Sequence, residues 1–191
     1  MDLSEINFAV LVASLIVAST PLVLAALGEL IVEKSGVLNL GVEGMMIIGA
    51  VAGFIVGVET GSAYIGMIAA AVAGALLSLL FAFIILIMQA NQVASGLALT
   101  IFGLGIAALM GHPYTGIKSP QISTISIPIL NEIPIVGTMF FQHDLIVYLS
   151  LISVLTIWYF LTRMRAGLIL RSVGEDHDVA HSLGYRVITI R

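Results

Sequence analysis

At residues 163–191 the sequence reads RMRAGLILRSVGEDHDVAHSLGYRVITIR, the only long stretch that is both charged and amphipathic. Five of the seven lysine and arginine residues lie in it. The sequence before it is strongly apolar, and arginine clustered beside the end of an apolar span marks the cytoplasmic side of a membrane. This segment therefore predicts a chain of membrane spans and indicates on which side of the membrane each span begins.

The same segment contains a short helix with recognisable ends. Asp176 is a favourable N-cap, and Asp178 places negative charge in the first turn, where the helix dipole favours it. Gly184 is a natural residue to follow the last turn. Ala180 and Leu183 share one face, so we expect the helix to press an apolar stripe onto another surface. That surface is either the rest of the protein or a cytoplasmic partner.

The composition predicts an all-α, polytopic integral membrane protein. Hydrophobic residues make up 60% of the sequence and charged residues 9%, with a mean hydropathy of +1.15, whereas globular proteins average roughly 25% charged residues. The absence of cysteine excludes a disulfide framework and a cysteine metal site. The first seven residues lack the positive charge of a signal peptide, so we expect a retained first span with an external N-terminus.

Five apolar stretches are long enough to cross a membrane. We expect spans at about residues 8–27, 40–58, 64–88, 93–110 and 145–162. Residues 28–44 are too polar for a plain span and predict a cytoplasmic turn leading into a broken or re-entrant segment. Prolines exclude a single helix in the external loop at 111–144. This order places every basic residue except Lys118 inside, as the positive-inside rule favours.

Small residues recur along one face of two spans, which permits close helix packing. The first ridge comprises Gly66, Ala70, Gly74, Ser78 and Ala82, and the second face comprises Gly96, Thr100, Gly103 and Ala107. The alternative is the general richness of membrane helices in glycine and alanine.

Two runs of the sequence resemble a known family. Leu170–Gly174 and Glu175, followed by Ala180, Gly184 and Tyr185, resemble the cytoplasmic loop of ABC importer permeases of the branched-chain amino acid, simple-sugar and nucleoside superfamily. Gly28, Glu29 and then residues 33–46, EKSGVLNLGVEGMM, resemble the N-terminal signature of the simple-sugar and nucleoside branch. The resemblance covers nearly the whole chain. Such permeases normally continue through several more spans, so we expect an N-terminal part of one.

The resemblance implies the permease subunit of an ATP-binding cassette importer in the bacterial inner membrane, moving nucleosides or simple sugars. It implies a cytoplasmic ATPase, a second permease subunit and an external substrate-binding protein as partners, with lipid around the spans. Neither lysine lies in a P-loop, so ATP hydrolysis is expected in a separate subunit. Neither a cofactor nor a nucleic acid partner is expected.

Polar residues in the apolar background are candidates for the translocation pathway. The candidates are Asn39, Glu43, Asn91, Gln92 and Thr100. Ionisable groups at membrane depth are functional candidates by default, and Glu43 lies where a span is broken. Alternatively, Glu43 pairs with Lys34 and caps the following helix. Asn91 and Gln92 would equally suit a solvated turn, and Thr100 would suit a bond to its own helix backbone.

The resemblance also implies a cytoplasmic coupling loop at 163–191 that contacts the ATPase. Its expected coupling residues are Arg171, Gly174, Glu175, Asp176, Ala180, Leu183, Gly184 and Tyr185. His177 and His181 have the spacing of a ligand pair on a helix, but no suitable third ligand follows, so no metal is expected.

Three other functions remain open. One is a branched-chain amino acid permease, which is distinguished from a nucleoside or sugar permease only by the residues of the family signature. In a fragment of a secondary transporter, Glu43 would carry protons or pair with a coupling ion at a broken helix. A structural membrane subunit would have packed spans and no polar pathway.

Overall fold

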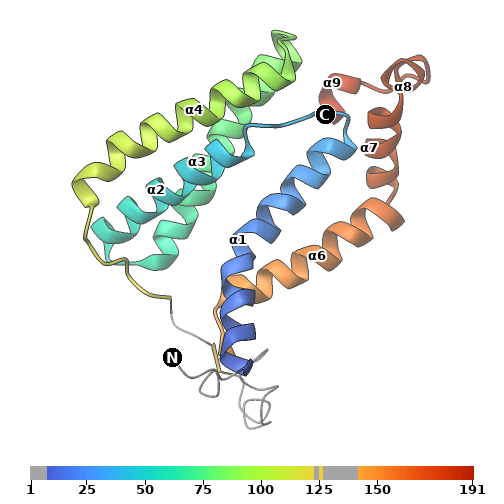
Figure 1. Ribbon diagram of the computed structural model, residues 1–191. Helices are drawn as coiled ribbons and strands as arrows, with labels where there is room; N and C mark the ends of the chain where they lie inside the picture. Colours follow the sequence, from blue (N-terminus) through green and yellow to red (C-terminus); the bar gives the residue numbers. More distant parts are fainter. Residues whose placement is uncertain (1–7, 123–124, 127–141) are drawn as a thin grey trace. The chain divides into compact units, whose positions relative to one another are not determined.

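The computed structural model describes residues 8–122, 125–126 and 142–191. These residues fall into two compact units, and α1 (Phe8–Lys34) contributes to both. The smaller unit holds α1 up to Gly28 and α6 (Leu145–Arg163). It also contains a short antiparallel pair, β1 (Ile125–Ser126) and β2 (Gln142–His143). Figure 1 labels both helices.

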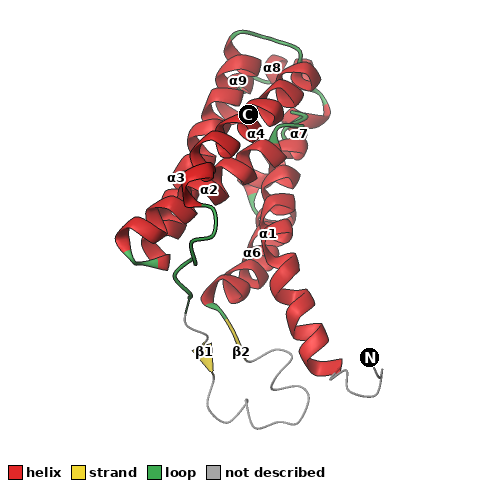
Figure 2. Cartoon of the chain, turned by 60° about the vertical axis from the view of Figure 1, so that its left-hand side comes forward, coloured by secondary structure: helices red, strands yellow, loops and turns green. Residues whose placement is uncertain are grey.

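The larger unit begins at Glu29 and contains the remaining helices. They are α2 (Val42–Thr60), α3 (Ala63–Ala82) with its π-helical continuation η2 (Phe83–Ile87), α4 (Gln92–Gly111) with the 3-10 turn η3 (His112–Tyr114), α7 (Arg165–Glu175), α8 (His177–Ser182) and α9 (Val187–Ile190). Figure 2 shows α2, α3 and α4 packed together. Five helices in the described residues are long and apolar enough to span a membrane, which confirms the all-α polytopic fold.

Glycine packs against glycine where α2 meets α3. A Cβ atom added to Gly66 would lie 2.5 Å from the carbonyl oxygen of Gly53, and one added to Gly53 would lie 2.8 Å from the Cβ atom of Ala70. The predicted ridge therefore packs closely at its first two members. Further along, a Cβ atom on Gly74 would lie no nearer than 3.8 Å to the Met45 carbonyl oxygen, so the contact loosens.

The second predicted face, on α4, lies against α2. A Cβ atom on Gly103 would lie 2.8 Å from the Cα atom of Gly44, so the two backbones touch. Apolar side chains close the space beside this contact. The buried core comprises Val37, Met45, Leu77, Phe81, Ile85 and Leu99.

The predicted end of the first helix is wrong. α1 continues through Lys34 instead of giving way to a turn at residue 28, and only residues 35–41 before α2 are non-helical. Gly36 ends the helix with left-handed backbone, φ 82°, and its N–H donates to the Glu33 carbonyl oxygen at 2.9 Å. In addition, residues 165–175 form a helix within the predicted loop at 163–191.

The predicted external loop at 111–144 is described only in part. It begins with η3 and reaches residue 122, and its last residues include β2. The rest of this loop, apart from β1, and the N-terminal residues 1–7 lie outside the described residues.

Candidate functional site

Residues 35–41, here called the connector, join α1 to α2 and are not helical themselves, so the backbone groups that the two helix ends leave unbonded need other partners. Asn39 is 6% exposed and supplies one of them. Its Oδ1 accepts a hydrogen bond from the Gly41 N–H at 2.9 Å, and its Nδ2 lies 3.7 Å from the Met45 sulfur. The predicted pathway residue Asn39 is therefore turned inward and fixes the shape of the connector.

Glu29, on the last turns of α1, also holds the connector. Its Oε1 accepts a hydrogen bond from the Asn39 N–H at 3.1 Å. Its Oε2 is buried and has no hydrogen-bond partner in the structure. Sequence reasoning placed Glu29 in the family-like run but not among the site residues. The sequence did not indicate that Glu29 contacts Asn39, because the end of α1 lies between them and was not predicted.

Two predicted residues at α4 contact the connector directly. Gln92 Oε1 accepts from the Leu38 N–H at 2.8 Å, and the Thr100 hydroxyl donates to the Leu40 carbonyl oxygen at 3.0 Å. The alternative in which Thr100 bonds to its own helix is therefore wrong. Asn91 is different: its Oδ1 accepts from the Ala94 N–H at 3.0 Å and caps α4.

Close backbone packing brings α4 against the connector. A Cβ atom on Gly96 would lie 2.9 Å from the Leu40 nitrogen and 3.0 Å from the Gly41 nitrogen. Val37 is buried at 5% exposure in the core beside α2, α3 and α4. Hydrogen bonds, a glycine contact and an apolar anchor therefore hold one short segment against the helices around it.

Glu43 lies in the first turn of α2 and is exposed. Among the described residues the one ion pair joins His177 and Asp178, at 3.7 Å, so the alternative pairing of Glu43 with Lys34 is wrong. Glu43 does not cap α2 either, because Gly41 occupies the N-cap position. A carboxylate in a first helical turn is still favoured by the helix dipole.

The coupling segment, residues 165–191, begins with α7, which sequence reasoning missed. Its buried residues Gly167, Leu170 and Val173 recur every three positions, and Val173 is fully buried. That period was the available signal for a helix. The predicted coupling residue Arg171 lies on α7 with its Nε buried and without a hydrogen-bond partner in the structure.

Two residues of the coupling segment meet the connector. Gly174 packs against the carbonyl oxygen of Lys34, and a Cβ atom added to it would also lie 2.8 Å from the Gly36 nitrogen. The Arg191 Nε–H donates to the Ser35 carbonyl oxygen at 3.0 Å. Figure 1 shows the end of α9 beside the connector. Gly174 was predicted as a coupling residue, whereas Arg191 was not.

Both predicted ends of the short helix, now α8, are confirmed. Asp176 Oδ1 accepts from the backbone N–H groups of residues 178 and 179, at 3.0 Å each, and Gly184 has φ 89°. The prediction that Ala180 and Leu183 share an apolar helix face is wrong, because α8 ends at Ser182 and the chain turns there. Ala180 is buried at 3% exposure, whereas Leu183 is 72% exposed.

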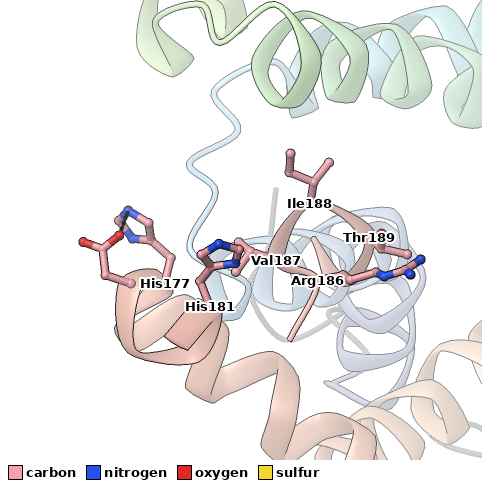
Figure 3. Close-up of a pocket in the computed structure, with 7 residues that line it drawn as sticks. His177, His181, Arg186, Val187, Ile188 and Thr189 are labelled. Carbon is pink, nitrogen blue, oxygen red and sulfur yellow. Dashed lines mark ion pairs between the residues drawn. The ribbon is translucent and has the colours of Figure 1, made fainter. Parts of the chain in front are cut away.

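The remaining predicted coupling residues flank α8. Glu175 is exposed at the end of α7, and Tyr185, 38% exposed, donates its N–H to the Ala180 carbonyl oxygen at 3.1 Å. An open pocket of about 450 Å³ lies between α8 and α9. Figure 3 shows its lining, which comprises His177, Asp178, His181, Arg186, Val187, Ile188 and Thr189. No group of three metal-ligating side chains occurs among the residues described.

Residues 11–191 match the protein family described as the permease component of the branched-chain amino acid transport system. The chain belongs to this permease family. With its five apolar helices, the permease chain is a multi-pass protein of the plasma membrane.

Three relatives narrow the branch of the permease family. A protein of Haloferax volcanii, named as a candidate glucose ABC transporter permease, is 39% identical over 91% of this chain. The guanosine ABC transporter permease of Bacillus subtilis is 35% identical over 100% of it, and the nucleoside ABC transporter permease of Lactococcus lactis is 32% identical over 95%.

The permease chain spans between 54% and 63% of the length of these relatives. No solved structure matches it. The relatives agree with the simple-sugar and nucleoside branch that the sequence of the connector region resembles.

Proposed function

We propose that this chain is part of the membrane-spanning subunit of an ATP-binding cassette importer. We further propose that the importer moves nucleosides or simple sugars, and of these two we favour nucleosides. The observation that most supports the proposal is the family match across residues 11–191. Two of the three relatives are named for nucleosides or guanosine, and one for glucose. An uncharged, hydroxyl-rich substrate suits a membrane pathway with amide and hydroxyl groups and few charges.

The proposed importer has three kinds of partner. A separate cytoplasmic ATPase hydrolyses ATP, a second permease subunit completes the pathway, and an external binding protein delivers substrate. Exposed apolar side chains on the coupling segment suit a protein partner, since Leu183 is 72% exposed, Val179 53% and Ile188 62%. We assign the ATPase to this surface and the transport pathway to the connector with Asn39, Glu43 and the start of α4.

The test uses the complete permease containing this chain, reconstituted in lipid with its ATPase subunits and binding protein. Guanosine-loaded binding protein should stimulate ATP hydrolysis and guanosine uptake, with glucose and leucine as competing substrates. Leu183→Glu should abolish co-purification of the ATPase, because it puts a charge into an apolar contact. The matched control Ile117→Glu, at a residue of the predicted external loop that is 45% exposed, should leave co-purification unchanged.

Two outcomes would overturn the proposal. If uptake proceeds without any ATPase, depends on a proton gradient and is lost in Glu43→Gln, the chain belongs to a secondary transporter. If leucine alone competes, the nucleoside and sugar assignment is wrong, although an ABC importer remains.

A further inference from the structure

The contact between the coupling segment and the connector is made of backbone on both sides. Gly174 approaches the Lys34 carbonyl oxygen and the Gly36 nitrogen without a side chain between them. Side chains absorb small movements by changing rotamer, whereas touching backbones have no such freedom, and packed interiors transmit strain. A displacement of α7 at Gly174 is therefore transmitted to the connector by direct backbone contact.

Gly36 suits this contact from the other side. Its φ of 82° lies in the left-handed region, and a Cβ atom there would lie 2.9 Å from a guanidinium nitrogen of Arg191 and 3.0 Å from the Gly174 Cα atom. The two glycines thus leave room for each other and for the arginine. Within the part of the chain that the structure describes, Arg191 adds one hydrogen bond to this contact, from its Nε–H to the Ser35 carbonyl oxygen at 3.0 Å.

The connector leads from this contact to the candidate pathway residue. Gly36 is three positions before Asn39 in the sequence, and the intervening Val37 is anchored in the core. Beyond Asn39, the Thr100 hydroxyl ties Leu40 to α4. A contiguous chain of packed and hydrogen-bonded groups therefore runs from α7 to the start of α2 and to α4.

We propose that Gly174 and Arg191 are positioning residues of the transport cycle, forming a clasp that makes the connector follow the coupling segment. This inference rests on the proposed function, since it assigns to the clasp the step between movement of the ATPase and movement at Asn39. Energetic coupling between two sites requires an element that both of them bias. The clasped connector is that element.

Gly174→Ala tests the clasp, and Gly105→Ala is its matched control. Both substitutions replace a glycine within a helix by alanine, but at Gly105 an added Cβ atom has no neighbour within 4 Å. In reconstituted permease that has retained its ATPase subunits, Gly174→Ala should change the ratio of transport to hydrolysis. It should lower substrate transported per ATP hydrolysed by about fivefold or more, the lower end of typical coupling effects. A merely structural defect would lower uptake and hydrolysis together and leave their ratio unchanged.

Arg191→Lys and Arg191→Met provide a second series. Lysine keeps the charge and can donate to the Ser35 carbonyl oxygen, whereas methionine keeps only the length. We expect the transport ratio to fall in the methionine variant and to be restored in part by lysine. Equal ratios in both, at the wild-type value, would overturn the role of Arg191.

A measurement without the ATPase separates the clasp from the proposed function. Leu38→Cys places a thiol on the connector at a residue that is 40% exposed, in a chain with no cysteine of its own. Any cysteine elsewhere in the complete protein is replaced by serine. Gly174→Ala should speed maleimide labelling of this thiol, and Gly105→Ala should not. Unchanged labelling would overturn the clasp even if transport is demonstrated, whereas faster labelling in a protein without ATP-driven uptake would leave the clasp and refute the proposed function.

Discussion

Thr100 differs from the other threonines of the spanning helices in its hydrogen-bond partner. Its hydroxyl donates to the carbonyl oxygen of Leu40, 60 residues away, at 3.0 Å. Thr156 donates instead to Ile152, one turn back in its own helix, at 2.8 Å. The first bond joins two segments, whereas the second supplements a carbonyl that the helix already satisfies.

We therefore predict that Thr100→Val destabilises the protein and that Thr156→Val does not. The first substitution removes a bond between segments, which in membrane proteins contributes about 0.6 kcal/mol on average and up to about 1.7 kcal/mol. Thermal unfolding of the purified permease in detergent measures both variants. Equal melting temperatures for the two variants would show that the Leu40 carbonyl is satisfied without Thr100.

At the residue scale, the sequence predicted polar side chains better than their partners. Asn39, Gln92 and Thr100 were singled out because amides and hydroxyls stand out in an apolar background, and all three hold the connector. Gly36 and Arg191 were not predicted at the site. The contact between Arg191 and Ser35 spans 156 residues, and no local pattern carries information over that distance.

Among the helices, α2 and α3 illustrate how glycine spacing determines packing. The four-residue spacing of Gly49, Gly53 and Gly57 matches the predicted ridge on α3, and this match was visible in the sequence. The sequence did not indicate how far the close contact extends. That depends on how the two helices diverge, which brings Gly66 against Gly53 but leaves Gly74 with only one neighbouring atom at 3.8 Å.

We predict that Gly66→Ala destabilises the α2–α3 contact, because the new methyl group would lie 2.5 Å from the Gly53 carbonyl oxygen. Overpacking of this kind costs about 1–3 kcal/mol. Gly105→Ala, with open space at the same atom, should be neutral or stabilising, since alanine is the better helix former. Thermal unfolding of both variants in detergent shows whether each substitution lowers or raises the stability of the protein. A stable Gly66→Ala protein would indicate that the two helices can move apart at little cost.

Helix ends were predicted unevenly from the sequence. The same signal, a glycine with left-handed backbone after the last turn, operates at Gly184 and at Gly36. It was recognised at Gly184, where an N-cap aspartate defined the other end of the helix. Before Gly36, the charged residues Glu29, Glu33 and Lys34 led to the prediction of a polar turn where the final turns of α1 lie. Polar composition alone does not end a helix.

At the scale of the whole molecule, the larger unit collects the segments predicted to lie on the same side of the membrane. The connector, the start of α4 and the coupling segment were all predicted inside, and they contact one another. The outer turn after α2 was predicted on the opposite side, as was the start of the external loop. There, Tyr114 donates to Glu59 Oε1 at 2.7 Å and its ring packs edge-on against Phe54.

The orientation itself is a prediction that single cysteines can check. Thr60→Cys, at the end of α2, should react with a membrane-impermeant maleimide in intact cells, because that end is expected outside. Leu183→Cys should react only after the membrane is permeabilised. The reverse pattern would invert every span and place the coupling segment outside, which would exclude contact with a cytoplasmic ATPase.

The clasp between Arg191 and Ser35 also has a consequence for the order of synthesis. The connector leaves the ribosome 156 residues before the arginine that binds it. At about 5–20 residues per second, this interval lasts about 8–30 seconds, during which α2, α3, α4 and α6 are made. Until then Gly36 and the Ser35 carbonyl group lack these partners. The contact thus forms long after the connector itself is made, so a ribosome stalled before codon 191 would yield inserted spans with an unlocked connector.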